Sequence, residues 1–330
     1  MKTKNIINTI ILIAFPLLVL GVSLFSGRYP KPLFIPLHVL QTDELAQQLV
    51  FNLRLPRLIT AALLGMSLSA AGGVMQMLFR NPLIEPGFLG VTQGAGFGAA
   101  LAILLMVTSP FIIEVSATFF ALLGLVLSYF IARRIRYGGW VLRLILSGIA
   151  VSAFFSAGLG VLKYLADPTS QLPEIVFWLL GGLYAVTWTD LFYILPVIII
   201  GLTIIYLMRW RLNLLSLSDE TAFSLGVAVG RERTLLLVAS VAVTAVVVSV
   251  AGIVGWIGLI IPHIARKATS ANAAEFIPLS MSLGAVFAIL CDDIARTLTV
   301  GEIPLGIITS LLGATIFLII MTSRNMRIAK

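Results

Sequence analysis

The sequence is poor in charged residues, cysteine and histidine. Only 11% of its 330 residues are charged and 59% are hydrophobic, a balance that excludes an ordinary soluble globular domain. The single cysteine, Cys291, excludes a disulfide within the chain and a cysteine metal cluster. The two histidines, His38 and His263, offer little for a histidine metal site, so we expect no bound metal.

The sequence also lacks the short motifs of common enzymes. It has no G-x-x-x-x-G-K-[ST] phosphate loop, so the chain does not hydrolyse ATP by that route. It has neither a G-x-S-x-G nor an H-E-x-x-H motif, and no row of Asp, Glu or His runs through its apolar segments. We therefore expect no catalytic residues and no cofactor in this chain, and the pattern argues against a proton-driven pump.

Long apolar segments fill most of the chain. The mean hydropathy is +1.08, and a run of about 20 apolar residues is long enough to cross a bilayer as a helix. We predict an all-α polytopic membrane protein with a single transmembrane domain over residues 1–330. We expect about ten membrane helices, at 6–25, 55–78, 90–108, 112–132, 142–163, 190–208, 234–251, 254–265, 278–298 and 304–322, and a separate short helix at about 172–182.

The basic residues predict which side of the membrane each connection faces. Lys2 and Lys4 precede the first apolar run, which is longer than the apolar core of a signal peptide and is interpreted as an uncleaved helix. With the N-terminus inside, most of the 22 Lys and Arg residues fall on the cytoplasmic side, as the positive-inside rule requires. Both termini and the connection at 214–230 are therefore expected in the cytoplasm.

The connection at 214–230 is amphipathic and polar enough to be soluble. The stretch Ser216-Leu217-Ser218-Asp219 fits the [ST]-x-x-[DE] pattern that begins a helix. Acidic residues then stand in the first turn, where the helix dipole favours negative charge. Small and apolar residues recur on one face at Ala222, Leu225 and Val229. This pattern is typical both of an ordinary loop helix and of a docking element that receives force from a soluble partner.

Ionisable residues near the ends of two apolar segments are further candidates. Asp292 and Asp293 lie four and three residues before Arg296, so either carboxylate can pair with it on one helix face. Arg54 and Arg57 flank the start of the segment at 55–78. Their guanidiniums suit carboxylates of a partner protein, and anchoring to lipid headgroups is the alternative explanation.

Several stretches together resemble one family, the FecCD-type permeases of ABC importers for iron chelates, haem and cobalamin. They occur in the family's order, as RLPR at 54–57, GVMQMLFRNPLIEPGFLG at 73–90, LSLSDETAFSLGV at 215–227, AGIVGWIGLIIPHIAR at 251–266 and EIPLGIITSLLG at 302–313. The resemblance implies a type II ABC importer permease in the cytoplasmic (inner) membrane. It implies a homodimer around a central path, two ATPase subunits that bind ATP and Mg²⁺ on the cytoplasmic face, and a substrate-binding protein outside.

The resemblance also implies roles for individual residues. The segment at 218–229 corresponds to the coupling helices that contact the ATPase, through Ser218, Asp219, Glu220, Ala222, Phe223, Leu225 and Gly226. The positions that receive acidic residues of the binding protein are Arg54, Arg57 and Arg296. The cytoplasmic gate corresponds to Tyr137, Gly138, Gly139 and Trp140. The helices at 142–163 and 304–322, with the short helix at 172–182, would line the path.

Alternatives to a chelate importer stay open at this point. Similar permeases also serve molybdate or tungstate, and such an oxyanion path would require positive or donor groups, of which the apolar segments hold few. A stand-alone secondary transporter would require ion-coupling residues at the bilayer midplane, and a membrane enzyme a catalytic cluster. Two different permeases could also pair in place of a homodimer.

Overall fold

Helices make up most of the described chain, as the apolar runs predict. The computed structural model describes residues 2–29, 33–106 and 109–322. The elements in chain order are α1 (Lys2–Phe25), β1 (Ser26–Gly27), β2 (Leu33–Phe34), α2 (Leu37–Thr42), α3 (Glu44–Gln48), η1 (Leu49–Arg54), α4 (Leu55–Leu78), η2 (Pro86–Leu89), α5 (Val91–Leu104), α6 (Pro110–Arg134), α7 (Trp140–Leu165), α8 (Gln171–Leu180), α9 (Trp188–Leu215), α10 (Asp219–Ser224), α11 (Val229–Ala251), α12 (Ile257–Ala268), α13 (Ala273–Thr297) and α14 (Leu305–Thr322).

A helix lies at each position where the sequence predicts one, including α8 at the expected short helix. Seven described helical runs are long and apolar enough to cross a membrane, so the chain is a multi-pass membrane protein. Helices α5 and α12 are shorter, with 14 and 12 residues, and the last two residues of the expected span 90–108 lie outside the described residues. The antiparallel pair of β1 and β2 was not predicted.

Helix α4 lies at the centre of the bundle because its sequence is rich in small residues. It packs against α1, α9, α11, α12 and α13. A Cβ added to Gly65 would lie 1.9 Å from the carbonyl oxygen of Gly284 on α13, and one added to Gly72 would lie 1.8 Å from that of Gly258 on α12. These glycines therefore allow the helix backbones to touch, which supplies packing where lipid offers no hydrophobic driving force.

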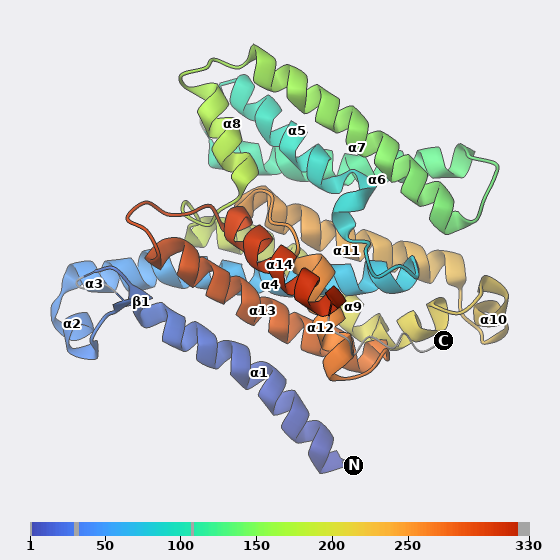
Figure 1. The fold of residues 1–330 in the computed structure, drawn as a ribbon, viewed down its shortest axis with the longest axis horizontal. Helices are drawn as coiled ribbons and strands as arrows, with labels where there is room; N and C mark the ends of the chain where they lie inside the picture. Colours follow the sequence, from blue (N-terminus) through green and yellow to red (C-terminus); the bar gives the residue numbers. More distant parts are fainter. Residues whose placement is uncertain (1, 30–32, 107–108, 323–330) are drawn as a thin grey trace.

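Helices α5, α6, α7 and α8 form a second group on one side of α4 and α11 (Figure 1). The glycine-rich start of α5 packs on α6, since a Cβ at Gly94 or Gly98 would lie 2.4 or 2.5 Å from an α6 carbonyl oxygen. The glycine cluster at 94–98 is thus a packing surface, and Gly124 on α6 contacts the backbone of Gly90 in the same way.

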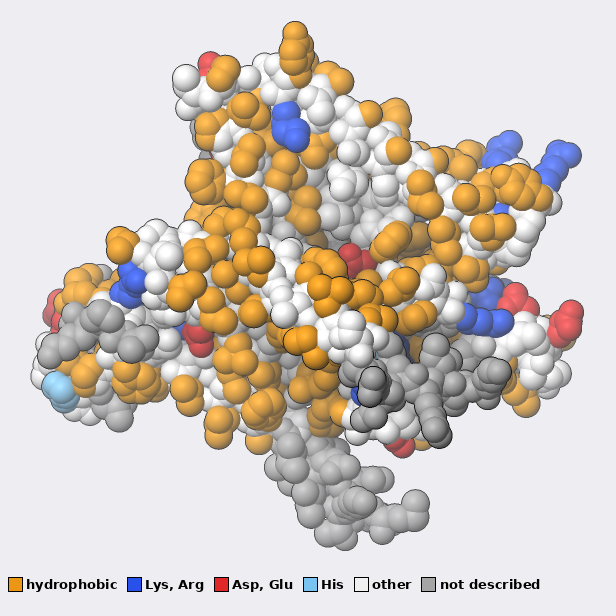
Figure 2. Space-filling view, in the orientation of Figure 1, with side chains coloured by type: hydrophobic (Ala, Val, Ile, Leu, Met, Phe, Trp, Pro, Cys, Tyr) orange, Lys and Arg blue, Asp and Glu red, His pale blue; other side chains and the backbone are white. Residues whose placement is uncertain are grey.

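The connections gather at two opposite ends of the molecule. The short elements β1, α2 and α3 lie at one end, here called the α2 end, and α10 with the α6–α7 connection lies at the other, here called the α10 end (Figure 1). Apolar side chains cover much of the surface between them, and most charged side chains lie toward the two ends (Figure 2). This distribution matches a protein whose middle is surrounded by lipid.

Candidate functional site

Helix α10 begins one residue after a serine that caps it. The Ser218 hydroxyl accepts a hydrogen bond from the Thr221 backbone N–H over 3.2 Å, and Asp219 and Glu220 occupy the first turn as predicted. The expectation that the helix begins at Ser216 was wrong. Ser216 instead ends α9 and donates its hydroxyl to the Asn213 carbonyl, because the buried Leu212 and Leu215 keep α9 helical to that point.

One side of α10 is anchored and the other is free. Ala222 is 1% exposed and fixes the helix to the bundle, whereas Phe223 is 76% exposed and Leu225 is 54% exposed. Gly226 ends the helix with a φ of +77°, a left-handed conformation that glycine adopts without steric cost. Two large apolar side chains are thus held outward on an anchored turn, an arrangement typical of surfaces that contact another protein.

A chain of contacts joins α10 to the start of α7. Arg233 on α11 donates from Nη2 to Asp219 Oδ1 over 2.7 Å, and this hydrogen bond holds the pKa of the Asp219 carboxyl below its ordinary value. The Arg233 guanidinium also lies 4.5 Å from the centre of the Trp140 ring, within cation–π range. The Trp140 ring in turn packs 5.3 Å from Phe79 at the end of α4. The sequence did not predict these contacts of Arg233, because this residue belongs to no recognised motif.

The residues expected at the gate lie at the same end as α10. Tyr137 is 66% exposed, and Gly138 has a φ of +75°, which turns the chain between α6 and α7. Gly139 precedes the first residue of α7, which is Trp140. The structure therefore places the expected gate beside the expected coupling segment, with Arg233 in contact with both.

A second contact connects α10 with the turn after α4. The Arg80 guanidinium donates to the Leu217 carbonyl just before α10, and Arg80 itself has a φ of +51°. A non-glycine residue in this conformation is strained and persists where surrounding contacts hold it. Arg80 is thus fixed against the residue that precedes the expected coupling segment.

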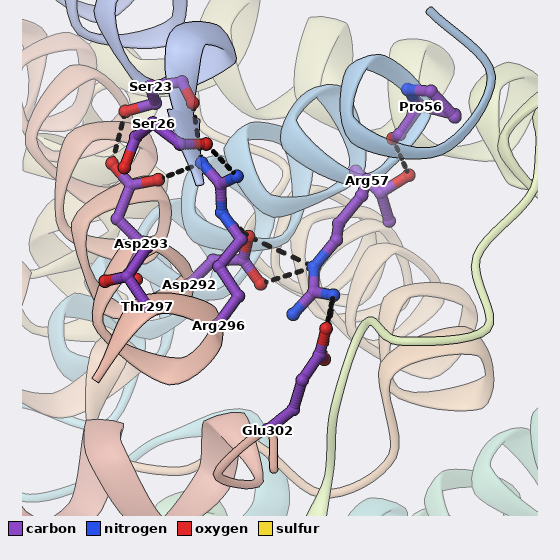
Figure 3. Close-up of polar contacts among 10 residues, drawn as sticks. Ser23, Ser26, Pro56, Arg57, Asp292, Asp293, Arg296, Thr297 and Glu302 are labelled. Carbon is purple, nitrogen blue, oxygen red and sulfur yellow. Dashed lines mark hydrogen bonds and ion pairs between the residues drawn. The ribbon is translucent and has the colours of Figure 1, made fainter. Parts of the chain in front are cut away.

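The α2 end holds a network of buried ion pairs (Figure 3). Arg57 on α4 donates from Nε to Asp292 Oδ1 on α13 over 2.8 Å, and from Nη1 to Glu302 over 2.8 Å. Arg296 lies 3.6 Å from Asp292 and bonds Asp293. Asp292 is fully buried. Because each buried charge faces opposite charges, the network ties α4, α13 and the 299–304 connection together.

This network confirms one prediction and bears on another. Asp292 and Asp293 do pair with Arg296 on one helix face, but the approach of Arg57 was not foreseen. The side chains of Arg57 and Arg296 are 11% and 6% exposed, and Arg54 packs against Gly27 of β1. Docking of a binding protein on these three arginines stays a prediction, and it requires the partner's carboxylates to compete with Asp292, Asp293 and Glu302.

Within the described part of the chain, no group of three or more His, Cys, Asp and Glu side chains could hold a metal ion. Cys291 is buried on α13 and free.

Comparison with known proteins identifies the family. The model of the FecCD transport family matches residues 12–323. The chain belongs to the FecCD transport family. As an ABC transporter permease of this family it is a membrane subunit without catalytic activity of its own.

Relatives of this FecCD chain include permeases for different cargoes. It is 38% identical to a probable iron chelatin transport system permease of Helicobacter pylori, covering 96% of this chain and 97% of the relative. It is 36% identical to the molybdate import system permease protein MolB of Haemophilus influenzae, covering 94% and 92%. Among solved structures it resembles a metal-chelate type ABC transporter in an inward-facing conformation, with a TM-score of 0.87, 36% identity and coverage of 95% and 98%.

Proposed function

We propose that this chain is the permease subunit of an ABC importer that carries a metal chelate into the cytoplasm. Two copies enclose the path in the cytoplasmic membrane, each with ten membrane helices and both termini in the cytoplasm. A separate ATPase dimer binds the α10 end, and a substrate-binding protein delivers cargo at the α2 end. The observation that carries the proposal is the anchored α10 turn with Phe223 and Leu225 held outward.

The geometry of the α10 end supports transmission of force from an ATPase. Asp219 on the coupling turn, Arg233 on α11 and Trp140 at the start of α7 are in direct contact. A displacement of α10 by a closing ATPase dimer is therefore passed to the α6–α7 connection through one guanidinium. Packed elements with two discrete arrangements convert such a displacement into alternating access.

The surface of the expected path favours a bulky chelate. Helices α7 and α14 expose large apolar side chains, among them Phe154 at 69%, Leu311 at 63% and Leu318 at 62%. A mostly apolar channel lets a large ligand pass without binding tightly. Molybdate is the second candidate, favoured by the similarity to MolB over 94% of the chain, although an oxyanion path requires positive or donor groups.

The proposal is tested by reconstituted uptake. The permease, its ATPase and its binding protein are placed in vesicles, and iron-siderophore, haem, cobalamin and molybdate are offered in parallel. We expect ATP-dependent uptake of one chelate. Uptake without ATP or ATPase would refute the importer, and uptake of molybdate alone would replace the chelate by the oxyanion.

The coupling surface is tested by ATPase association. Phe223→Ser and Leu225→Ser remove the exposed apolar groups without touching the buried Ala222, so we expect a folded permease that retains less ATPase and loses ATP-driven uptake. Leu298→Ser is the matched control, because Leu298 is 64% exposed at the opposite end. Equal ATPase retention by all three variants would exclude α10 as the docking element.

A further inference from the structure

A cavity of about 360 Å³ lies at the α10 end between the end of α6 and the starts of α7 and α11. Its lining includes Arg133 of α6, Arg143 of α7 and Arg233 of α11, with aromatic rings of Tyr129 and Trp140 beside them. Lys and Arg side chains gather around this end of α6 and α7 (Figure 2). The volume greatly exceeds the roughly 10–15 Å³ that a cavity needs to hold one water molecule, so the cavity can hold a polar group of several atoms.

The arginines that line the cavity retain unused donors. The Nε atoms of Arg143 and Arg233 are buried and have no hydrogen-bond partner among the described residues. Arg143 uses Nη1 for the Ile135 carbonyl, and the Arg233 Nη atoms bind Asp219. Buried guanidinium N–H groups without acceptors are costly, and an anion with several oxygens would satisfy them.

The carboxylates near the cavity do not neutralise all of the arginines that line it. Asp219 pairs with Arg233, and its side chain is 61% exposed. Glu232 points to Arg211, 3.8 Å away. Two of the three lining arginines, Arg133 and Arg143, thus have no ion pair within the described chain. A planar guanidinium fork is well matched to phosphate oxygens.

Two of the helices that line the cavity carry exposed apolar side chains nearer to the middle of the bundle. Val126 lies three residues before Tyr129 on the same face of α6 and is 59% exposed. Val238 lies four residues after Thr234 of the cavity lining, on the same face of α11, and is 47% exposed. Positive donors at the rim with apolar surface beneath them fit a molecule with an anionic head and acyl chains, and not a free anion.

We propose that this cavity binds the phosphate headgroup of an anionic phospholipid, with the acyl chains along Val126 and Val238. Its phosphate oxygens accept hydrogen bonds from Arg133 and Arg143 and from Arg233 Nε. Since Arg233 also contacts Asp219 and Trp140, the bound lipid supports the contact that joins the coupling segment to the expected gate. This site is independent of which cargo is carried.

Lipid retention by the full-length permease tests the site. The purified protein is mixed with phosphatidylglycerol or with phosphatidylcholine of the same acyl chains, and native mass spectrometry counts the retained lipid. We expect tighter retention of phosphatidylglycerol. Arg133→Gln should weaken it about fivefold, the effect of one basic residue at a membrane surface, and Arg143→Gln should do the same. Arg231→Gln is the control, because Arg231 is an exposed α11 arginine outside the cavity.

Several outcomes would overturn the proposal. Equal retention of the two lipids, or unchanged retention in Arg133→Gln, would exclude a headgroup site. Because Arg133 is exposed, this variant keeps the test valid even where Arg143→Gln fails to fold. Displacement of phosphatidylglycerol by an equal concentration of inorganic phosphate would identify a free-anion site instead. Release of the lipid when the ATPase binds would refute the proposed support of the Arg233 contacts with Asp219 and Trp140 by the bound lipid.

Discussion

Replacing Arg57 by methionine tests whether the buried network at the α2 end holds the bundle together. Methionine keeps most of the apolar stem and removes the guanidinium, so Asp292 loses the hydrogen bonds that reach both of its oxygens at 2.8 and 3.1 Å. Arg296 remains 3.6 Å from Asp292, too far for a hydrogen bond. The fully buried Asp292 carboxylate would thus keep Arg296 as an ion-pair partner at this longer distance and lose both hydrogen bonds from Arg57.

The expected loss of stability follows from this burial. Breaking a buried ion pair on one side costs about 3–5 kcal/mol, and the remaining Arg296 places Arg57→Met near the lower value. A loss of about 3 kcal/mol lowers the folding equilibrium constant about 150-fold. Glu302→Gln is the matched comparison, because the Glu302 side chain is 44% exposed and such a pair contributes at most about 1 kcal/mol.

Equilibrium unfolding in mixed micelles of SDS and a mild detergent measures both variants. The double variant Arg57→Met with Asp292→Leu removes both buried charges, so it should be more stable than Arg57→Met alone. The reasoning is wrong if Arg57→Met is no more destabilising than Glu302→Gln, or if the second substitution lowers stability further.

Three further predictions concern packing, a charged loop and a helix cap. Gly65→Ala should destabilise the fold by about 1–3 kcal/mol or more, because the new Cβ would meet the Gly284 backbone. Gly21→Ala is the control, because a Cβ at Gly21 would have no atom within 4 Å. This variant should unfold like the parent protein in the same micelles. Hydroxyl and amide donors in the loop after α7 lower the pKa of Asp167 to about 2. The stability that the Asp167 carboxylate contributes is therefore present above the ordinary pKa of 3.8 and is lost as pH falls toward 2. An NMR chemical shift of the Asp167 carboxyl carbon that titrates at the ordinary pKa would contradict this. Ser218→Ala should raise amide hydrogen exchange in α10, because loss of an N-cap costs about 1 kcal/mol, and unchanged exchange would show that the cap is dispensable.

Local pattern explains why much of the fold could be predicted. The helix at 55–78 was predicted with the bounds of α4, since its apolar length and Pro56 at the first turn are local signals. The sequence pattern placed the N-cap at Ser216, two residues before the observed cap Ser218. Only the burial of Leu215 shows that α9 continues to this point. Residues close in sequence, such as Asp293 and Arg296, were paired correctly, since helix geometry alone brings them together.

The sequence by itself determined the helices, the membrane class and the resemblance to the family, because apolar length, glycine content and short motifs are read along the chain. Only the tertiary structure decided which distant side chains meet. Arg57 and Asp292 are 235 residues apart, and Arg233 reaches both Asp219 and Trp140 across three elements. Such contacts depend on how helices pack against one another, and helix packing in lipid is set by the close approach of backbones at small residues such as Gly65 and Gly284.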